Sequence, residues 1–367
     1  MINALNLMRW VSCKSAAIAM LIALGSVQSV TDLKAADISP ALADVIKAAS
    51  AEKKLRLTWS DDTLGGNVGI QEIMAGLNKM YGTKIEAEYA PSPVPMDQVG
   101  NQLMAESKAG RSARVDALLT SSSSAGRLAR GDFLLPVDWK ALMPNRITPQ
   151  MMEADGQVLR FVTYIAGITY NTKLLPNPPK DLAGFLDPKF KGRLASTPSA
   201  SAFDVLGSTD FWGPQKTIDY AKALSGQISG LMRCSEPERV ASGEFLALLF
   251  DCGGLVAARL QEQGAPIAQL IVPEFVQQRY FYFGIPKNAT QVNAAKLFIT
   301  YMMTEEGQKL AWKHWWSDLH MLPGSKTAKQ LQEAHVDLAN AKDIGIDWLD
   351  AHPEGDEAKR EIVKILR

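Results

Sequence analysis

Apolar and polar positions follow two different periods along this chain, and segments of the two kinds alternate. Residues 70–80 carry apolar side chains at three- and four-residue steps, the period of an amphipathic helix: Ile70, Ile73, Leu77 and Met80. Residues 84–89 alternate with a period of two, which predicts a strand. Because strands that alternate with helices form βαβ units, we expect an α/β fold with mixed, mainly parallel sheets and flanking helices.

The same patterns extend this alternation over most of the chain. Further strands are predicted at 55–59, 115–119, 165–170, 193–196, 245–250 and 280–283. Further helices are predicted at 38–51, 96–107, 125–130, 203–206, 214–224, 237–242, 255–263, 292–303 and 305–316, and in most of the tail after residue 323. Apolar residues make up 47% of the 367 residues, which is enough for two cores, so we expect two domains.

The N-terminal segment has the pattern of an export signal. Arg9 and Lys14 supply positive charge, residues 16–24 form a short uncharged apolar run, and a small, polar stretch follows with cleavage expected after Ser29 or Ala35. The run has roughly half of the ~20 residues that cross a bilayer. We therefore expect a cleaved signal peptide and a soluble mature protein, with a buried amphipathic helix as the alternative.

The charge balance and the known catalytic motifs exclude several classes of function. The chain has 39 Lys+Arg and 39 Asp+Glu residues and no basic block, which argues against nucleic acid as a partner. It contains no GxSxG, HExxH or phosphate-loop motif, so we expect neither catalysis nor a cofactor. An exported hydrolase is the alternative, and a nucleophile beside a base in a cleft would reveal it.

The cysteines predict a disulfide. Cys13 precedes the apolar run of the signal, which leaves Cys234 and Cys252 in the mature chain. An even number of cysteines in an exported chain favours a bridge, with two buried thiols as the alternative. Because there is no CxxC pair and no nearby pair of histidines, these two residues are not expected to bind a metal.

Small polar residues follow the first predicted strand, and ligands bind at the carboxyl ends of strands in parallel sheets. The candidates at this end are Trp59, Ser60, Asp61 and Thr63. Trp59 can stack on an organic ligand or lie in the core. Asp61 can meet an amine or cap the next helix. Both alternatives stay open at this point.

Two further segments rich in hydroxyl groups follow other predicted strands. They contain the candidates Ser121, Ser122 and Ser123 in one segment and Thr197 and Ser199 in the other. Hydroxyls and free backbone N–H groups at the start of a helix attract carboxylate, phosphate or sulfonate groups. The alternative is ordinary capping of the helices that follow.

Several segments, taken in order, resemble one known family, the periplasmic solute-binding proteins of ABC importers in their ferric-iron-type branch. The similar segments are ITYNTKLL at 168–175, DPKFKGR at 187–193, SGE at 242–244, QGAP at 263–266, GIPKNA at 284–289 and TEEGQ at 304–308. Each motif is weak alone, but together they stand in register from residue 55 to residue 307. The family resemblance therefore extends over most of the chain.

The resemblance implies a type II periplasmic binding protein, in which two α/β lobes close around a ligand in the cleft between them. After a signal peptide at 1–35, the first lobe would take 36–163 and 285–367, and the second 164–284. The implied partners are a small-molecule solute and an ABC permease in the inner membrane. We expect a periplasmic monomer, with a sensor that signals to a membrane receptor as the alternative.

Five more candidates lie near the implied hinge and cleft. Asp251 ends a predicted strand, and Gly253 and Gly254 allow the backbone to approach a ligand or simply form a tight turn. Arg279 can pair with an anion or lie on the surface. Tyr164 can line the cleft or pack at the hinge. The aromatic residues at 312–316 are interpreted as core.

The chain departs from the iron-binding members of the family at one place. Those members carry two adjacent tyrosines after the buried strand that follows Gly-Glu, whereas this chain has residues 251–254 (DCGG) there. Phenolate oxygens suit ferric iron, and glycine offers no comparable donor. The four histidines lie late in the chain, away from the candidate loops: His314, His320, His335 and His352. We therefore expect no metal, and an organic solute that is anionic or zwitterionic, with ferric iron as the alternative.

Overall fold

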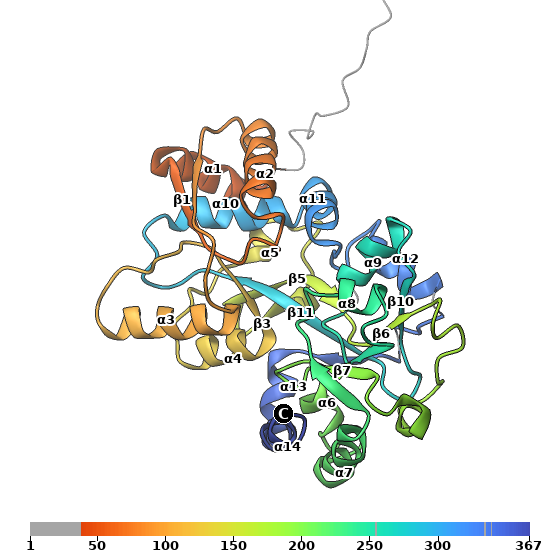
Figure 1. Cartoon of the computed structure of the whole chain (residues 1–367). Coiled ribbons are helices and arrows are strands. Elements are labelled where there is room, and N and C mark those ends of the chain that lie inside the picture. The colour runs from red at the N-terminus through yellow and green to blue at the C-terminus, as the bar shows by residue number, and fades with distance from the viewer. Residues whose placement is uncertain (1–37, 254, 334, 339) are drawn as a thin grey trace, which may run out of the picture. The chain divides into compact units, whose positions relative to one another are not determined.

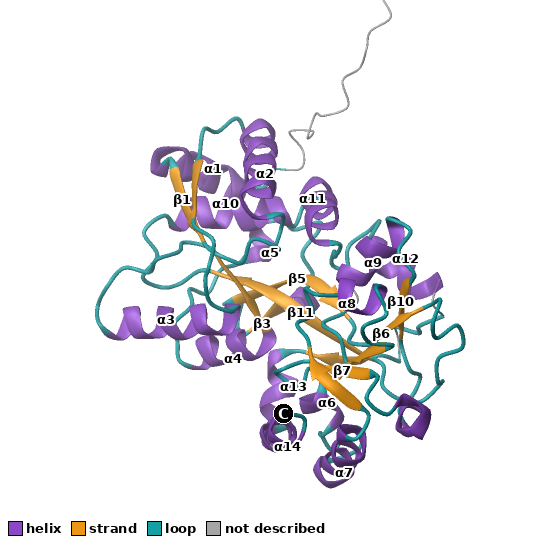
Figure 2. Cartoon of the chain, in the orientation of Figure 1, coloured by secondary structure: helices purple, strands orange, loops and turns teal. Residues whose placement is uncertain are grey.

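Strands from distant parts of the chain combine into separate sheets in the computed structural model, which describes residues 38–253, 255–333, 335–338 and 340–367. The predicted signal peptide lies outside the described residues. Strands β1 (Lys54–Leu57) and β2 (Glu86–Tyr89) form a parallel pair. Two larger sheets follow, and helices lie around all of them (Figure 2).

Two long antiparallel strands form the centre of one sheet. These are β5 (Val158–Tyr164) and β11 (Gln277–Gly284), which lie side by side (Figure 1). The other side of β11 pairs with β3 (Leu118–Ser121) along one half and with β12 (Lys342–Ile344) along the other. The short β4 (Met152–Glu153) pairs with β5. We call this the central sheet.

The other large sheet contains five strands in the order β10-β6-β9-β7-β8. Strands β7 and β9 and strands β7 and β8 are parallel, whereas β6 pairs antiparallel with both of its neighbours. We call this the five-stranded sheet. Its strands are β6 (Ile168–Asn171), β7 (Leu194–Ser196), β8 (Ile228–Leu231), β9 (Ala247–Leu249) and β10 (Ile267–Leu270).

An α/β fold with mixed sheets is confirmed, but parallel pairs do not predominate in it. In the central sheet only β11 and β12 run parallel, among the described residues. The reason is the path of the chain. Strand β5 leads out of the central sheet and β11 leads back into it, so the two run in opposite directions and pair antiparallel.

Helices begin and end largely where the sequence predicts. Helix α1 starts after Ser39, whose side chain accepts a hydrogen bond from the N–H of Leu42, and α11 starts after Thr304, which accepts from Gly307. No described helix combines the length and the apolar composition that a membrane crossing needs. The helices are α1 (Pro40–Glu52), α2 (Gly66–Tyr81), α3 (Met96–Lys108), α4 (Ser122–Arg130), α5 (Trp139–Leu142), α6 (Phe203–Leu206), α7 (Pro214–Ser225), α8 (Glu238–Ala241), α9 (Leu255–Glu262), α10 (Val292–Met302), α11 (Glu305–Trp315), α12 (Lys326–Glu333), α13 (Ile346–Ala351) and α14 (Pro353–Ile365).

Two differences from the predicted elements bear on the site. Helix α4 begins at Ser122, not at residue 125, so the serine run forms its first turn. Strand β5 is not predicted, because the charged Arg160 interrupts its apolar pattern. In the structure this guanidinium donates to Glu153 and to Asp343 at 2.7 Å each, which allows it to be buried. The patterns also miss the short strands β4, β8, β10 and β12.

The buried apolar side chains fall into separate clusters. The largest surrounds the central sheet and the β1–β2 pair and includes Trp59, Phe161 and Phe283. A second cluster surrounds the five-stranded sheet, and α14 packs there against α6 and α7. The chain passes between the two sheets at 165–167 and again at 271–276. The division into two lobes stays a prediction, and the last helix shares its core with residues of the second predicted lobe.

We predict that Ile362→Ala in α14 lowers the free energy of unfolding by about 2–5 kcal/mol. Ile362 is fully buried in the second cluster, so the truncation leaves a cavity between α14 and its neighbours. Chemical denaturation measures the change. Lys364→Ala, at an exposed position of the same helix, is the control. Equal stabilities for the two variants would mean that α14 does not belong to this core.

Candidate functional site

A cavity of about 240 Å³ is lined by residues from both large sheets and from the loops beside them. One group of lining residues comes from the parts of the chain around the central sheet: Ser60, Asp62, Thr63, Met96, Phe281 and Trp315. The other group comes from the five-stranded sheet and its loops: Thr169, Cys234, Ser235, Pro237, Leu248, Asp251, Cys252 and Ala257. We call this space the Asp62–Asp251 cavity.

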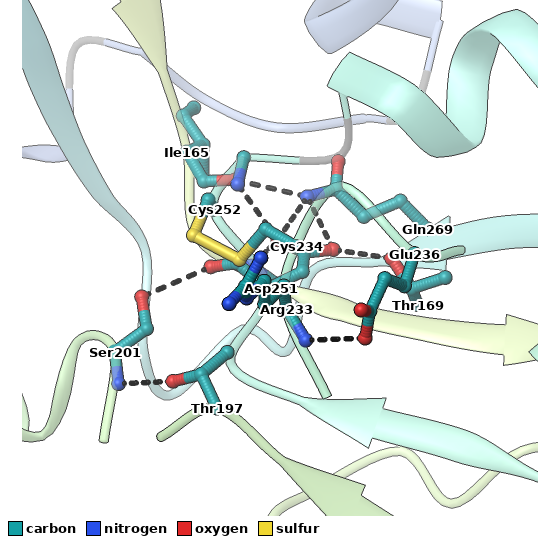
Figure 3. The surroundings of a disulfide bond; sticks show 12 residues. Ile165, Thr169, Thr197, Ser201, Arg233, Cys234, Glu236, Asp251, Cys252 and Gln269 are labelled. Atoms are coloured by element: carbon teal, nitrogen blue, oxygen red, sulfur yellow. Dashed lines mark hydrogen bonds between the residues drawn. A yellow bond between two sulfur atoms is a disulfide. The ribbon is translucent and has the colours of Figure 1, made fainter. Parts of the chain in front are cut away.

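The carboxylate of Asp251 is buried in the wall of this cavity and accepts several hydrogen bonds (Figure 3). The N–H groups of Gly167 and Gly253 donate to it at 3.0 and 2.9 Å, and the Thr169 hydroxyl donates at 2.6 Å. The side-chain amide of Gln269 donates to both oxygens, at 3.0 and 3.2 Å. Burial nevertheless raises the pKa of Asp251, because none of these donors carries a charge.

The predicted disulfide between Cys234 and Cys252 is confirmed, and it forms part of the cavity wall (Figure 3). Their Cα atoms are 5.7 Å apart. The bridge ties the segment before α8 to the turn that follows β9, next to Asp251. It therefore restrains the turn that contains Asp251.

The loop that follows β1 contributes hydroxyls and one carboxylate to the cavity. The Ser60 and Thr63 hydroxyls are hydrogen-bonded to each other at 3.0 Å, and Asp62 is exposed beside them. Burial raises the pKa of the nearby Tyr89 to about 12, with smaller contributions from the carboxylates of Asp61 and Asp62. The carboxylates of Asp61 and Asp62 thus place negative charge on this loop.

Two aromatic rings form another part of the wall. Phe281 comes from β11 and Trp315 is the last residue of α11, and their ring centroids are 4.8 Å apart. Trp315 also stacks on Phe161 at 6.4 Å. The sequence patterns place residues 312–316 in the core, because an aromatic helix face usually packs there. Neither Trp315 nor Thr169 is among the candidates from the sequence, and no local pattern marks them.

The serine run acts as a helix cap. Ser121 is the N-cap of α4 and accepts from the N–H of Ser124, while its own hydroxyl donates to Asp97. The hydroxyl of Ser122 is buried and donates to the carbonyl of Tyr280 at 3.0 Å. None of the predicted Ser121, Ser122 and Ser123 lines the Asp62–Asp251 cavity. The hydroxyls of these three serines therefore form hydrogen bonds within the fold.

Other predicted residues also lie away from this cavity. Trp59 is 1% exposed and packs against Tyr89 and Phe298 in the core. Asp61 and Ser199 are exposed, and the buried Thr197 accepts from the N–H of Ser201. The predicted Gly254 lies outside the described residues. The structure therefore brings Ser60, Thr63 and Asp251 together, and leaves these others apart.

Tyr164 and Gly253 line a second cavity, of about 390 Å³. Gly253 has a φ of +102°, and a Cβ placed there would lie 2.5 Å from the Cβ of Tyr164. This contact and the backbone conformation both require glycine. Gly253 thus packs against the start of the first crossover, which fits the tight-turn alternative.

Arg279 is buried in an ion pair with Asp204, at 3.2 and 3.3 Å. Although burial opposes it, Arg279 and the nearby Lys359 hold the pKa of Asp204 well below its ordinary value. Arg279 therefore has a partner inside the fold and does not line the Asp62–Asp251 cavity. Within the described residues, no group of three or more His, Cys, Asp or Glu side chains is arranged to hold a metal ion.

Comparison with protein families matches residues 72–341 to the bacterial extracellular solute-binding proteins. The chain belongs to this family. A curated relative, an uncharacterized protein of Haemophilus influenzae, is 32% identical over 162 residues. That match spans 41% of this chain and 46% of the relative, somewhat less than half of each.

Solved structures show the fold that this solute-binding protein adopts. Iron-bound HitA from Pseudomonas aeruginosa is 19% identical, with a TM-score of 0.67 over 84% of this chain and 99% of HitA. The periplasmic binding protein AfuA from Actinobacillus pleuropneumoniae, with fructose-6-phosphate bound, is 21% identical, with a TM-score of 0.64 over 85% of this chain and 97% of AfuA. An ABC transporter substrate-binding protein from Agrobacterium tumefaciens is 16% identical, with a TM-score of 0.69 over 86% of this chain and 94% of that one. The type II periplasmic binding protein fold is thereby confirmed.

We predict that removing the disulfide with the pair Cys234→Ser and Cys252→Ser lowers the free energy of unfolding by about 3 kcal/mol. The bridge closes a loop across 18 positions of the sequence, and opening it frees the unfolded chain. Denaturation with and without a reductant measures the effect. The reductant should destabilise the unchanged protein to the same degree and leave the double variant unaffected. If the reductant also lowered the stability of the double variant, its effect could not be attributed to the Cys234–Cys252 bridge.

We predict that Asp204→Asn lowers the free energy of unfolding at pH 7 by about 3–5 kcal/mol, because Arg279 then stays buried without its counter-ion. The native pKa of Asp204 is depressed, so its contribution is complete above pH ~4, the unfolded value, and is lost at lower pH. The difference in free energy of unfolding between the variant and the unchanged protein should therefore become smaller below pH ~4.

Denaturation curves recorded at several pH values test this narrowing. Asp219→Asn, which changes an exposed carboxylate on α7, serves as the control and should change stability little at any pH. If the difference in free energy of unfolding between Asp204→Asn and the unchanged protein stays constant as the pH falls, the loss of stability does not come from the ion pair.

Proposed function

We propose that this protein is the periplasmic substrate-binding component of an ABC importer. It captures a small organic solute in the Asp62–Asp251 cavity, closes around it and delivers it to an inner-membrane permease, without catalysing a reaction. The observation that carries the proposal is the composition of the cavity wall, which combines residues from the two large sheets. A solute that contacts both groups of residues stabilises the arrangement in which they approach each other.

The path of the chain supports a closing motion. The segments 165–167 and 271–276 connect the central sheet to the five-stranded sheet, and they are short. Changes of backbone angle in such connections suffice for hinge closure. Asp251 and Gln269 lie beside these connections, since Gln269 donates to the carbonyl of Ile165 at 2.9 Å as well as to Asp251.

The chemistry of the wall favours an organic solute over ferric iron. Where iron-binding relatives carry two tyrosines, this chain has a carboxylate occupied by hydrogen bonds and a cysteine locked in a disulfide. The aromatic rings of Phe281 and Trp315 offer an apolar surface, and hydroxyls of Ser60 and Thr63 offer hydrogen bonds. A largely apolar wall with a few polar groups is typical of sites for small organic molecules.

A thermal-shift screen tests the proposal. The panel contains amines, amino acids, carboxylates, sugar phosphates, neutral sugars and ferric iron, each added to the mature protein. Because a bound ligand stabilises the native state by mass action, a solute at 100 times its Kd adds about 2.7 kcal/mol and raises the Tm. We expect at least one organic solute to do so, and X-ray scattering to show a more compact protein with that solute.

Two outcomes would contradict this proposal. A rise in Tm with ferric iron alone would show that the ligand is a metal ion and not an organic solute. A complete absence of stabilisation across the panel, with no change in scattering, would remove the basis for a solute receptor of this kind.

A further inference from the structure

The charges on the wall of the Asp62–Asp251 cavity all have the same sign. Two carboxylates line it, and no Lys, Arg or His belongs to the described residues of the wall. We infer that the solute carries a protonated or quaternary amine, held between the Asp62 carboxylate and the rings of Phe281 and Trp315. This inference rests on the proposed function and names the chemical class of its solute.

The buried carboxylate of Asp251 supplies the first argument. It is 3% exposed, and its partners are backbone N–H groups, a hydroxyl and an amide, all of them neutral. An ionised carboxylate that is removed from water without a counter-charge is destabilised. A cation in the adjacent cavity would offset this penalty, whereas an anion there would increase it, and the low local dielectric strengthens both effects.

Asp62 supplies the second argument. Its side chain lines the cavity and forms no hydrogen bond or ion pair with another described residue, so it can meet a ligand directly. The N-terminus of α2 lies close along the chain, at Gly66, and its dipole contributes about half a positive charge. The full negative charge of Asp62, which lines the cavity, outweighs this half charge. The potential at this end of the cavity therefore attracts cations.

The aromatic pair supplies the third argument. Phe281 and Trp315 are both only partly buried, and both border the same cavity as the carboxylates. A cation within about 6 Å of an aromatic face is attracted by the ring, and tryptophan gives the strongest attraction. Carboxylates and aromatic rings on one wall thus favour an ammonium group over a neutral or an anionic one.

The features that favour an anion in the sequence have other roles in the structure. The Ser121 hydroxyl caps α4, the Ser122 hydroxyl bonds to the backbone, and Arg279 is paired with Asp204. Arg233, which Figure 3 shows beside Cys234, is exposed and does not line the cavity. A zwitterion can satisfy this arrangement with its amine in the cavity, but a solute with negative charge alone cannot.

Asp62→Asn tests the inference, with Asp61→Asn as the matched control. Both side chains are exposed neighbours on one loop, but only Asp62 lines the cavity. The probes are putrescine, choline, glycine betaine and arginine, each compared with a neutral or anionic molecule of similar size. Calorimetry should show that at least one amine binds, and that Asp62→Asn weakens this binding by about tenfold or more while Asp61→Asn changes it little.

A second variant separates the aromatic contribution. Trp315→Leu should weaken binding of the same amine, and Trp315→Phe should restore part of it, because a smaller ring still attracts the cation. Thermal unfolding of both variants shows whether they remain folded. Equal affinities for Trp315→Leu and the unchanged protein would overturn the placement of the amine on these rings.

The other outcomes distinguish this inference from the proposed function. If only carboxylates, sugar phosphates or neutral sugars bind, the amine class is wrong and the solute receptor stands. If an amine binds equally well to the unchanged protein and to Asp62→Asn, the amine does not use this cavity as inferred. If no organic solute of any class binds, both the inference and the receptor fail.

Discussion

The buried carboxylate of Asp251 holds together the parts of the chain that meet at the site. It accepts from Gly167 in the first connection between the sheets, from Thr169 in β6 and from Gln269 in β10. It also accepts from Gly253 in its own turn. Because an unsatisfied buried carboxylate is strongly destabilising, these donors are held in place around it. The turn that carries the disulfide is thereby fixed to the first connection and to strands β6 and β10.

The antiparallel pair of β5 and β11 determines which side chains reach the cavity. Phe281 on β11 packs against Trp315 from α11 and against Tyr164 from β5, so three distant segments meet at these strands. The same two strands contain the buried guanidiniums of Arg160 and Arg279, and each has carboxylate partners within the fold. The guanidiniums on these strands are thus neutralised internally, while no cation of the described part of the chain pairs with the carboxylates of the cavity wall.

The elements of this fold were largely predictable, and the site only in part. Helices with a clear apolar face, such as α2 and α10, follow directly from their periodicity. Strand β5 did not, because Arg160 resembles a solvent-facing residue until its partners Glu153 and Asp343 are known. Ser60, Thr63 and Asp251 were predicted from their positions after strands, and the structure places them on one cavity. Trp315 was not, because it lies on a helix whose other aromatic residues gave no reason to expect exposure.

The sequence by itself determined the class of the fold and the family, which depend on local periodicity and on motifs in order. It favoured the pairing of Cys234 with Cys252 through the even number of cysteines, and the structure showed the bridge. Only the tertiary structure decided which charges remain uncompensated. Arg279 and the serine run suggested an anion, but ion pairs and caps form between residues far apart in the chain. The charge that a cavity presents is what remains after such pairing, and no local pattern contains it.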